Sequence, residues 1–198
     1  MERKNLESAA VSYPYLRGLF SIQLGIAFIL AGLTNLKWGP LSHIWVFCVS
    51  VLVVGAAYVP IMRYYNDNYG RVTPPRKRQV RDAVATVIGA AVIVEASVLV
   101  HSLNLPVSGI AASFALIMLA YYAISVGLRR HHMIIWGSLL VVSLLPVWGG
   151  VGSDSRSNIG LLLIGVATIA TGIFDHVALV RTLGSSKGPN LETSNVGE

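Results

Sequence analysis

The sequence predicts an all-α polytopic integral membrane protein, a six-transmembrane-helix bundle built from three helical hairpins. Three observations predict this fold class. Of the 198 residues, 54% are hydrophobic and only 12% are charged, which is about half the charged fraction of an average soluble domain. The apolar residues form long runs separated by short polar or Gly- and Pro-containing segments. Most Lys and Arg residues border these runs, as is typical of chains oriented in a bilayer.

The first helix is expected over 15–36, after a polar cytoplasmic lead-in at 1–14. An α-helix rises about 1.5 Å per residue, so a run of this length crosses a hydrocarbon core of about 30 Å. The run is too long for the apolar part of a secretory signal, so we expect it to be retained. Gly18, Gly25 and Gly32 recur at every seventh position and predict a stripe that another helix can approach closely.

The next three helices are expected over 42–62, 80–103 and 107–128. The segment 35–40 contains Gly and Pro, which end a helix and favour a tight turn before the second apolar run. The second run contains no Asp, Glu, Lys or Arg. The third and fourth helices are separated at 104–106, where Asn and Pro divide a run too long for one crossing.

The fifth helix is expected over 133–148 and the sixth over 159–180. The fifth is the shortest apolar run, and Pro146 lies near its far end. The six helices together form one membrane domain over 15–182. The remaining tail, 183–198, is rich in Gly, Ser and Asn, so we expect it to be disordered on the cytoplasmic side.

The distribution of positive charge predicts the orientation. With six crossings, thirteen of the fifteen Lys and Arg residues lie on the same side as both termini, and the other side carries only Lys37 and Arg156. The positive-inside rule places the more basic side in the cytoplasm, so both termini are expected there. The pattern is typical of small bacterial multi-pass proteins. The expected location is therefore a bacterial plasma membrane.

The longest polar loop is expected between the second and third helices, at 63–82, and reads RYYNDNYGRVTPPRKRQVRD. Its Asn, Gly and Pro residues disfavour one continuous helix. Its basic side chains set the orientation, and they could also bind anionic lipid headgroups or a cytoplasmic partner. The residues expected to carry this binding are Arg71, Arg76, Lys77, Arg78 and Arg81.

Glu95 is the acidic residue that lies deep inside a predicted helix, about 20 Å from its basic entrance and hence in the outer half of the bilayer. An ionised carboxylate in lipid costs a few kcal/mol or more, so we expect Glu95 to face the bundle interior, paired or protonated. Gln23 and Ser97 are candidate partners. Two roles remain open: a hydrogen bond that bridges helices, or a proton or cation site in a transport path.

The sixth helix carries a second candidate site. One face of this helix presents small residues, followed by an acidic residue near its end. Gly165, Gly172 and Asp175 share this face at helical spacing. The glycines are expected to admit a neighbouring helix. Asp175 and His176 form a candidate polar site at the inner face, either as a gate or ion site or as part of an ion pair. The basic residues expected to pair with Asp175 are Arg129, Arg130 and Arg181.

The five histidines do not predict a metal or haem site. His43 and His101 are expected near the outer face, and His131, His132 and His176 near the inner face, without an H-E-x-x-H motif. The adjacent His131 and His132 leave their helix about 100° apart, which makes them poor partners for one ion. We therefore predict neither metal nor cofactor.

A P-loop and a G-x-G-x-x-G motif are missing from the sequence. Ser97 and His101 are four residues apart on one helix face, but Ser hydroxyls commonly bond to their own helix. The single cysteine, Cys48, excludes an intramolecular disulfide. We expect no catalytic activity, although an intramembrane enzyme is not excluded. Nucleic acid is not an expected partner despite the net charge of +6, since no soluble recognition module is present.

Two classes of function fit these features. The first is a membrane-embedded accessory or regulatory component of a larger complex, which docks on a membrane-protein partner through helix faces and the basic loop. The alternative is a transporter or channel for a small solute or ion that uses Glu95 as its coupling site. A six-helix bundle is thin for a solitary pathway, so this alternative implies a homo-oligomer.

Overall fold

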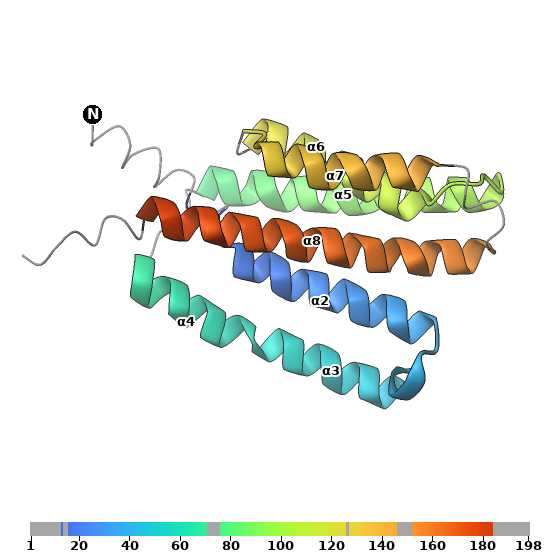
Figure 1. Ribbon diagram of the computed structural model, residues 1–198, viewed down its shortest axis with the longest axis horizontal. Coiled ribbons are helices and arrows are strands. Elements are labelled where there is room, and N and C mark those ends of the chain that lie inside the picture. Colours follow the sequence, from blue (N-terminus) through green and yellow to red (C-terminus); the bar gives the residue numbers. More distant parts are fainter. Residues whose placement is uncertain (1–12, 14–15, 71–75, 126, 146–151, 184–198) are drawn as a thin grey trace, which may run out of the picture.

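The computed structural model describes residues 13, 16–70, 76–125, 127–145 and 152–183 (Figure 1). The expected lead-in, 1–14, and tail, 183–198, lie almost wholly outside the described residues. In the part of the chain that the structure describes, all regular elements are helices. They are α2 (Gly18–Asn35), the short 3₁₀ helix η2 (Gly39–Ser42), α3 (Ile44–Ala56), α4 (Tyr58–Tyr69), α5 (Arg76–Ser102), α6 (Gly109–Ser125), α7 (Arg130–Leu144) and α8 (Ser153–Leu183).

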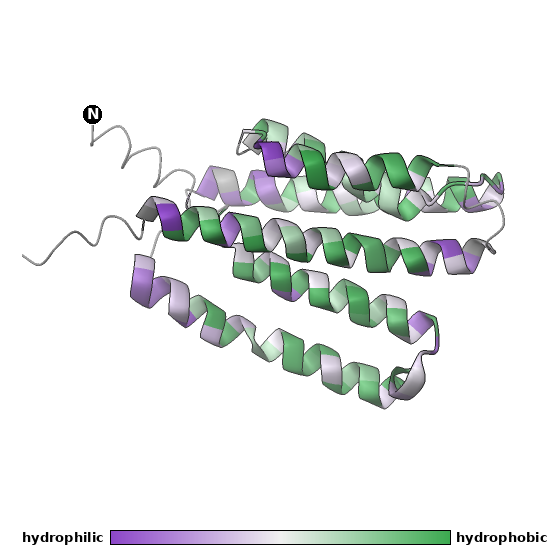
Figure 2. Cartoon of the chain, in the orientation of Figure 1, coloured by the Kyte–Doolittle hydropathy of each residue, from purple (hydrophilic) through white to green (hydrophobic). Residues whose placement is uncertain are grey.

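Four stretches of helix are long and apolar enough to cross a membrane. They are Gly18–Asn35, Ile44–Tyr69, Gln79–Ser102 and Asp154–Thr182, while Gly109–Ile124 is apolar but shorter. Hydrophilic residues gather at the ends of the long helices, and hydrophobic residues fill their middles (Figure 2). This distribution is what a membrane environment requires of a helix.

The second apolar run forms two helices, α3 and α4, that meet at Ala57. Pro60 lacks an N–H and its ring clashes with the carbonyl group four residues earlier, that of Ala56. The helix is therefore interrupted just before Pro60. α4 then continues to Tyr69, past the predicted end at residue 62, and ends at Gly70, whose φ of +78° suits glycine.

The segment 63–82 is not one continuous helix, as expected, because α4 ends at Tyr69 and α5 begins at Arg76, but helix extends further past residue 62 than the sequence predicts. The side chain of Tyr65 is fully buried and packs in a cluster with Tyr13, Leu16 and Leu179. This tertiary contact outweighs the low helix propensity of the neighbouring Asn and Asp residues. The third helix likewise begins earlier than expected, at Arg76, so the basic loop is shorter than the sequence predicts.

The most extensive helix contact joins α2 to α8, which run side by side in opposite directions (Figure 1). The glycines of α2 face the glycines of α8: Gly18 lies against Gly172, and Gly25 against Gly165. Gly32 continues the seam against the backbone of Asn158. A Cβ atom at Gly25 would lie 2.7 Å from the carbonyl oxygen of Gly165. The predicted glycine stripes are confirmed, and they are each other's partners.

α8 lies between α2 on one side and α6 and α7 on the other. The core of this second contact contains Trp136 from α7, Ile164 from α8 and small residues of α6. Contacts within the three expected hairpins are present, yet the two most extensive contacts, α2 with α8 and α6 with α7, join helices of different hairpins. α3 has no buried residue and forms the edge of the bundle.

We predict that Gly25→Ala lowers the free energy of unfolding by about 1–3 kcal/mol, because the added methyl group displaces backbone at the seam. The matched control is Gly137→Ala in α7, where an added Cβ would meet no described atom of another element within 4 Å. That variant should be neutral or stabilising by up to about 1 kcal/mol. Thermal unfolding of the two variants in detergent micelles measures the difference, and equal melting temperatures would contradict the seam.

Candidate functional site

The most concentrated set of polar side chains in the described residues surrounds Asp175 of α8. Its carboxylate is 1% exposed. Nε2 of His131 lies 3.1 Å and Nε2 of His132 lies 3.0 Å from the same oxygen, Oδ1. The hydroxyl of Tyr122 donates a hydrogen bond to the other oxygen, Oδ2, at 3.4 Å. Three helices, α6, α7 and α8, therefore converge on one buried carboxylate.

The local structure explains this convergence. Arg129 is extended and precedes α7, so His131 and His132 occupy its first turn. The N-terminal end of a helix carries a partial positive charge that favours a nearby carboxylate. The ring of Tyr122 stacks on the ring of His132 with centroids 3.7 Å apart, which holds the imidazole in place. His132 is fully buried, whereas the side chain of His131 is 21% exposed.

At this site the structure contradicts one sequence-based expectation and changes the basis of another. The described partners of Asp175 are two histidines and a tyrosine, in place of the expected Arg129, Arg130 or Arg181. His131 and His132 were expected to be poor partners because their side chains diverge. They meet because Asp175 lies between the two directions, and an imidazole is long enough for both Nε2 atoms to reach one oxygen.

His176 points to a different part of the bundle from its neighbour Asp175. Its Nδ1 lies 3.2 Å from the hydroxyl of Tyr65 on α4. The same hydroxyl accepts a hydrogen bond from the backbone N–H of Leu19 at 3.0 Å. That N–H belongs to the first turn of α2, where no partner exists inside the helix. Asp175 and His176 thus join α8 to α6 and α7 on one side, and to α2 and α4 on the other.

A cluster of aromatic residues surrounds the contact between His176 and Tyr65. The hydroxyl of Tyr13 donates to the carbonyl oxygen of Tyr65 at 3.2 Å, and the guanidinium of Arg17 lies 4.6 Å from the centre of the Tyr13 ring. Such a cation–π contact contributes about 0.5–2 kcal/mol, depending on how far it is removed from water. Tyr13, Tyr64, Tyr65 and Tyr69 therefore pack on one another.

The residues predicted to surround Glu95 do not come together. Glu95 itself is exposed on α5, so the expectation that it faces the bundle interior is wrong. Gln23 donates its amide to the carbonyl oxygen of Val54 at 2.6 Å, between α2 and α3. Ser97 donates to the carbonyl oxygen of Ile93 in its own helix at 2.6 Å. α5 packs mainly on α6, and Glu95 lies on the uncovered side of that contact.

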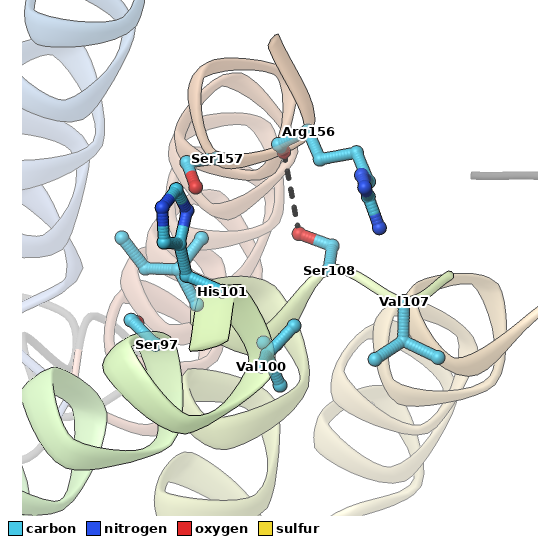
Figure 3. Close-up of a pocket in the computed structure, with 9 residues that line it drawn as sticks. Ser97, Val100, His101, Val107, Ser108, Arg156 and Ser157 are labelled. Carbon is cyan, nitrogen blue, oxygen red and sulfur yellow. Dashed lines mark hydrogen bonds between the residues drawn. The ribbon is translucent and has the colours of Figure 1, made fainter. Parts of the chain in front are cut away.

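A small pocket lies at the other end of the bundle, where the α5–α6 turn meets the start of α8 (Figure 3). Ser97 and His101 of α5 line it together with Ser108, Arg156 and Ser157. Arg156 is 7% exposed, and its guanidinium donates to the backbone carbonyl of Leu105 and to the side chain of Asn104. From the sequence, Arg156 is only a charge on the outer side. Nothing in its local pattern predicts that its guanidinium bonds to the α5–α6 turn.

The basic residues expected to bind lipid headgroups are described only in part. Arg71 and the side chain of Arg78 lie outside the described residues. Arg76, Lys77 and Arg81 are exposed at the start of α5. Arg81 also pairs with Asp82 at 3.3 Å, an exposed contact that contributes little to stability. The exposed end of α5 is compatible with a headgroup surface, and that role stays a prediction.

No protein-family model, curated protein or solved structure matches this chain. The inference of function therefore rests on the contacts, burial and charges of the described residues.

We predict that Tyr65→Phe lowers the free energy of unfolding by about 1–3 kcal/mol, because the part-buried N–H of Leu19 loses its acceptor. The control is Tyr58→Phe, which lies about two turns earlier on α4 and is 51% exposed. That change should shift stability by less than about 0.5 kcal/mol. Denaturant or thermal unfolding in micelles measures both variants. Equal stability of the two would show that the Tyr65 hydroxyl does not cap α2.

Proposed function

We propose that this chain is a multi-pass integral membrane protein in which α2, the pair α3–α4, α5, α6, α7 and α8 all cross the bilayer, with both termini in the cytoplasm. Support comes from the four long apolar helices. α6 and α7 have 17 and 15 residues, and 15 residues span about 22 Å. Helices shorter than the hydrocarbon core are accommodated by local thinning and by flanking basic side chains such as Arg129 and Arg130. The proposed location is a bacterial plasma membrane.

Cysteine labelling tests this orientation at the two ends of α5. In a Cys48→Ser background, Ser102→Cys should react with a membrane-impermeant maleimide in intact cells, and Lys77→Cys should react only after the cells are opened. Both native side chains are exposed, so differences in reactivity report the side of the membrane. Labelling of Lys77→Cys but not of Ser102→Cys in intact cells would show the opposite orientation. Labelling of both in intact cells would show that α5 does not cross.

Within this frame we propose that the protein has no catalytic activity and serves as an accessory or regulatory component of a membrane complex. One observation carries the proposal: the carboxylate of Glu95 is exposed on a helix that is otherwise long and apolar. Exposed Val and Leu residues on α5 need no partner because lipid covers them. A carboxylate in the hydrocarbon region costs a few kcal/mol or more, so it requires a polar group from outside the chain.

The position of Glu95 makes it unfavourable for its carboxylate to reach water at the nearer membrane surface. It lies about 10 Å before the end of α5 at Ser102. Side chains on a helix tilt toward its N-terminus, which for α5 is the distant, basic end. Glu95 therefore points toward the centre of the bilayer and away from the nearer interface. A protein partner that covers this face would remove the carboxylate from lipid.

The chemistry of Glu95 indicates the kind of partner. We propose a transmembrane helix of another protein that presents a basic or hydrogen-bond-donating side chain at the depth of Glu95. Polar contacts of this kind associate helices within lipid. A symmetric contact with a second copy would bring like carboxylates together, so a different chain is the better complement. The exposed basic end of α5 could contribute a second contact to the same partner on the cytoplasmic side.

Site-specific photo-cross-linking tests this docking face. A photoreactive residue at Val98, which is 58% exposed on α5, should give a heteromeric adduct of one mass in cells. A photoreactive residue at Val53, which is 66% exposed on α3, is the control and should not give that adduct. Glu95→Leu should abolish the Val98 adduct while leaving the melting temperature of the purified chain unchanged or higher, because Leu suits lipid better than Glu.

Three outcomes would contradict the docking proposal. They are equal adducts from Val98 and Val53, an adduct at Val98 that persists in Glu95→Leu, or adducts only between copies of this chain. The last outcome would favour the alternative of a homo-oligomeric transporter or channel. That alternative gains no support from the positions of Gln23 and Ser97, which bond away from Glu95. Proton or solute flux into liposomes, sensitive to Glu95→Gln, would establish it.

A further inference from the structure

We propose that His131, His132 and Asp175 bind one divalent transition-metal ion, with Zn²⁺ as the best fit. The ligand atoms are Nε2 of each imidazole and Oδ1 of the carboxylate, and these atoms all lie within 4.8 Å of one another. This site is separate from the docking face on α5 and does not depend on it. The expectation of no metal rested on the missing H-E-x-x-H motif and on the divergence of the two histidines, whose Nε2 atoms nevertheless meet at one carboxylate oxygen.

The distances suit a small tetrahedral ion. Zn²⁺ bonds to imidazole nitrogen and carboxylate oxygen are about 2.0–2.2 Å long, so neighbouring ligands of a tetrahedral ion lie about 3.3–3.5 Å apart. The two nitrogen-to-oxygen distances are 3.1 and 3.0 Å. A small outward movement of the imidazoles makes room for the ion. The fourth position stays open, as in zinc sites that have three protein ligands.

The charge at the site also favours a cation. Asp175 is buried, and its described partners are two imidazoles and a hydroxyl, none of which carries a permanent positive charge. Removing a carboxylate from water is costly unless a cation or several donors compensate it. A divalent ion bound to Oδ1 supplies that charge. Two nitrogen ligands select a zinc-type ion over Mg²⁺ or Ca²⁺, which prefer oxygen.

Neighbouring side chains hold the ligands in position and leave an entry path for the ion. Tyr122 donates to Oδ2, so the carboxylate can bind an ion through Oδ1 while the hydroxyl orients it. The ring of Tyr122 also stacks on His132. Nδ1 of His132 has no described hydrogen-bond partner, so this nitrogen can carry the ring proton when an ion takes the place of the contact between Nε2 and Oδ1. The partly exposed His131 opens the site to the helix ends.

The test uses the full chain purified in detergent without a polyhistidine tag and stripped with a chelator. Titration with Co²⁺ should give the intense visible absorption of a tetrahedral site, saturating at one ion per chain, and Zn²⁺ should displace it. His131→Gln and Asp175→Asn should weaken binding by more than about 100-fold, since loss of a supporting partner alone typically costs about 10–100-fold. Tyr122→Phe should weaken it by about 10–100-fold.

The matched control is His176→Gln, which alters a histidine adjacent to Asp175 that bonds to Tyr65 instead. It should bind Co²⁺ as the unaltered chain does. If Asp175→Asn fails to fold, His131→Gln decides the question, because that side chain is partly exposed. Zn²⁺ should raise the melting temperature of the unaltered chain and leave that of His131→Gln unchanged. Binding below one ion per chain, an octahedral spectrum, or equal affinity in His131→Gln and His176→Gln would overturn the proposal.

Discussion

The close approach of α2 and α8 is the contact on which the rest of the bundle depends. Lipid offers no hydrophobic drive to bring apolar helices together, so stability comes from dispersion contacts at short range and from polar contacts between helices. Gly18, Gly25 and Gly32 meet Gly172, Gly165 and the start of α8, and this brings the two backbones into contact. Because α8 then packs on α6 and α7 with its other faces, the seam positions both halves of the bundle.

Asp175 and His176 follow directly from this seam. Gly172 fixes the depth and rotation of α8 against Gly18, and one turn later the two polar residues leave the helix on different faces. One reaches His131, His132 and Tyr122, and the other reaches Tyr65 beside the start of α2. The candidate metal ligands are therefore held by helix packing and by the ring of Tyr122 stacked on His132, as a preorganised binding site requires.

Glu95 shows the opposite situation. It lies on α5, far from the glycine seam, on a face that no described element covers. The carboxylate of Asp175 is surrounded by side chains of its own chain, whereas an exposed carboxylate in an apolar helix faces groups of another molecule. The two acidic residues thus divide the proposed roles. In these proposals Asp175 belongs to an internal site, and Glu95 belongs to a contact with a partner.

The sequence by itself determined the membrane character, the approximate helix positions and the glycine stripes, because these follow from local composition and spacing. It also placed Asp175, His131 and His132 toward the same end of the bundle. Only the tertiary structure decided which stripes are partners, how far α4 continues, and which way Glu95 faces. Each of these depends on the rotation of one helix against another. The pattern of residues along one helix does not specify that rotation. A rotation of a few tens of degrees about the helix axis is enough to expose a carboxylate that would otherwise be buried.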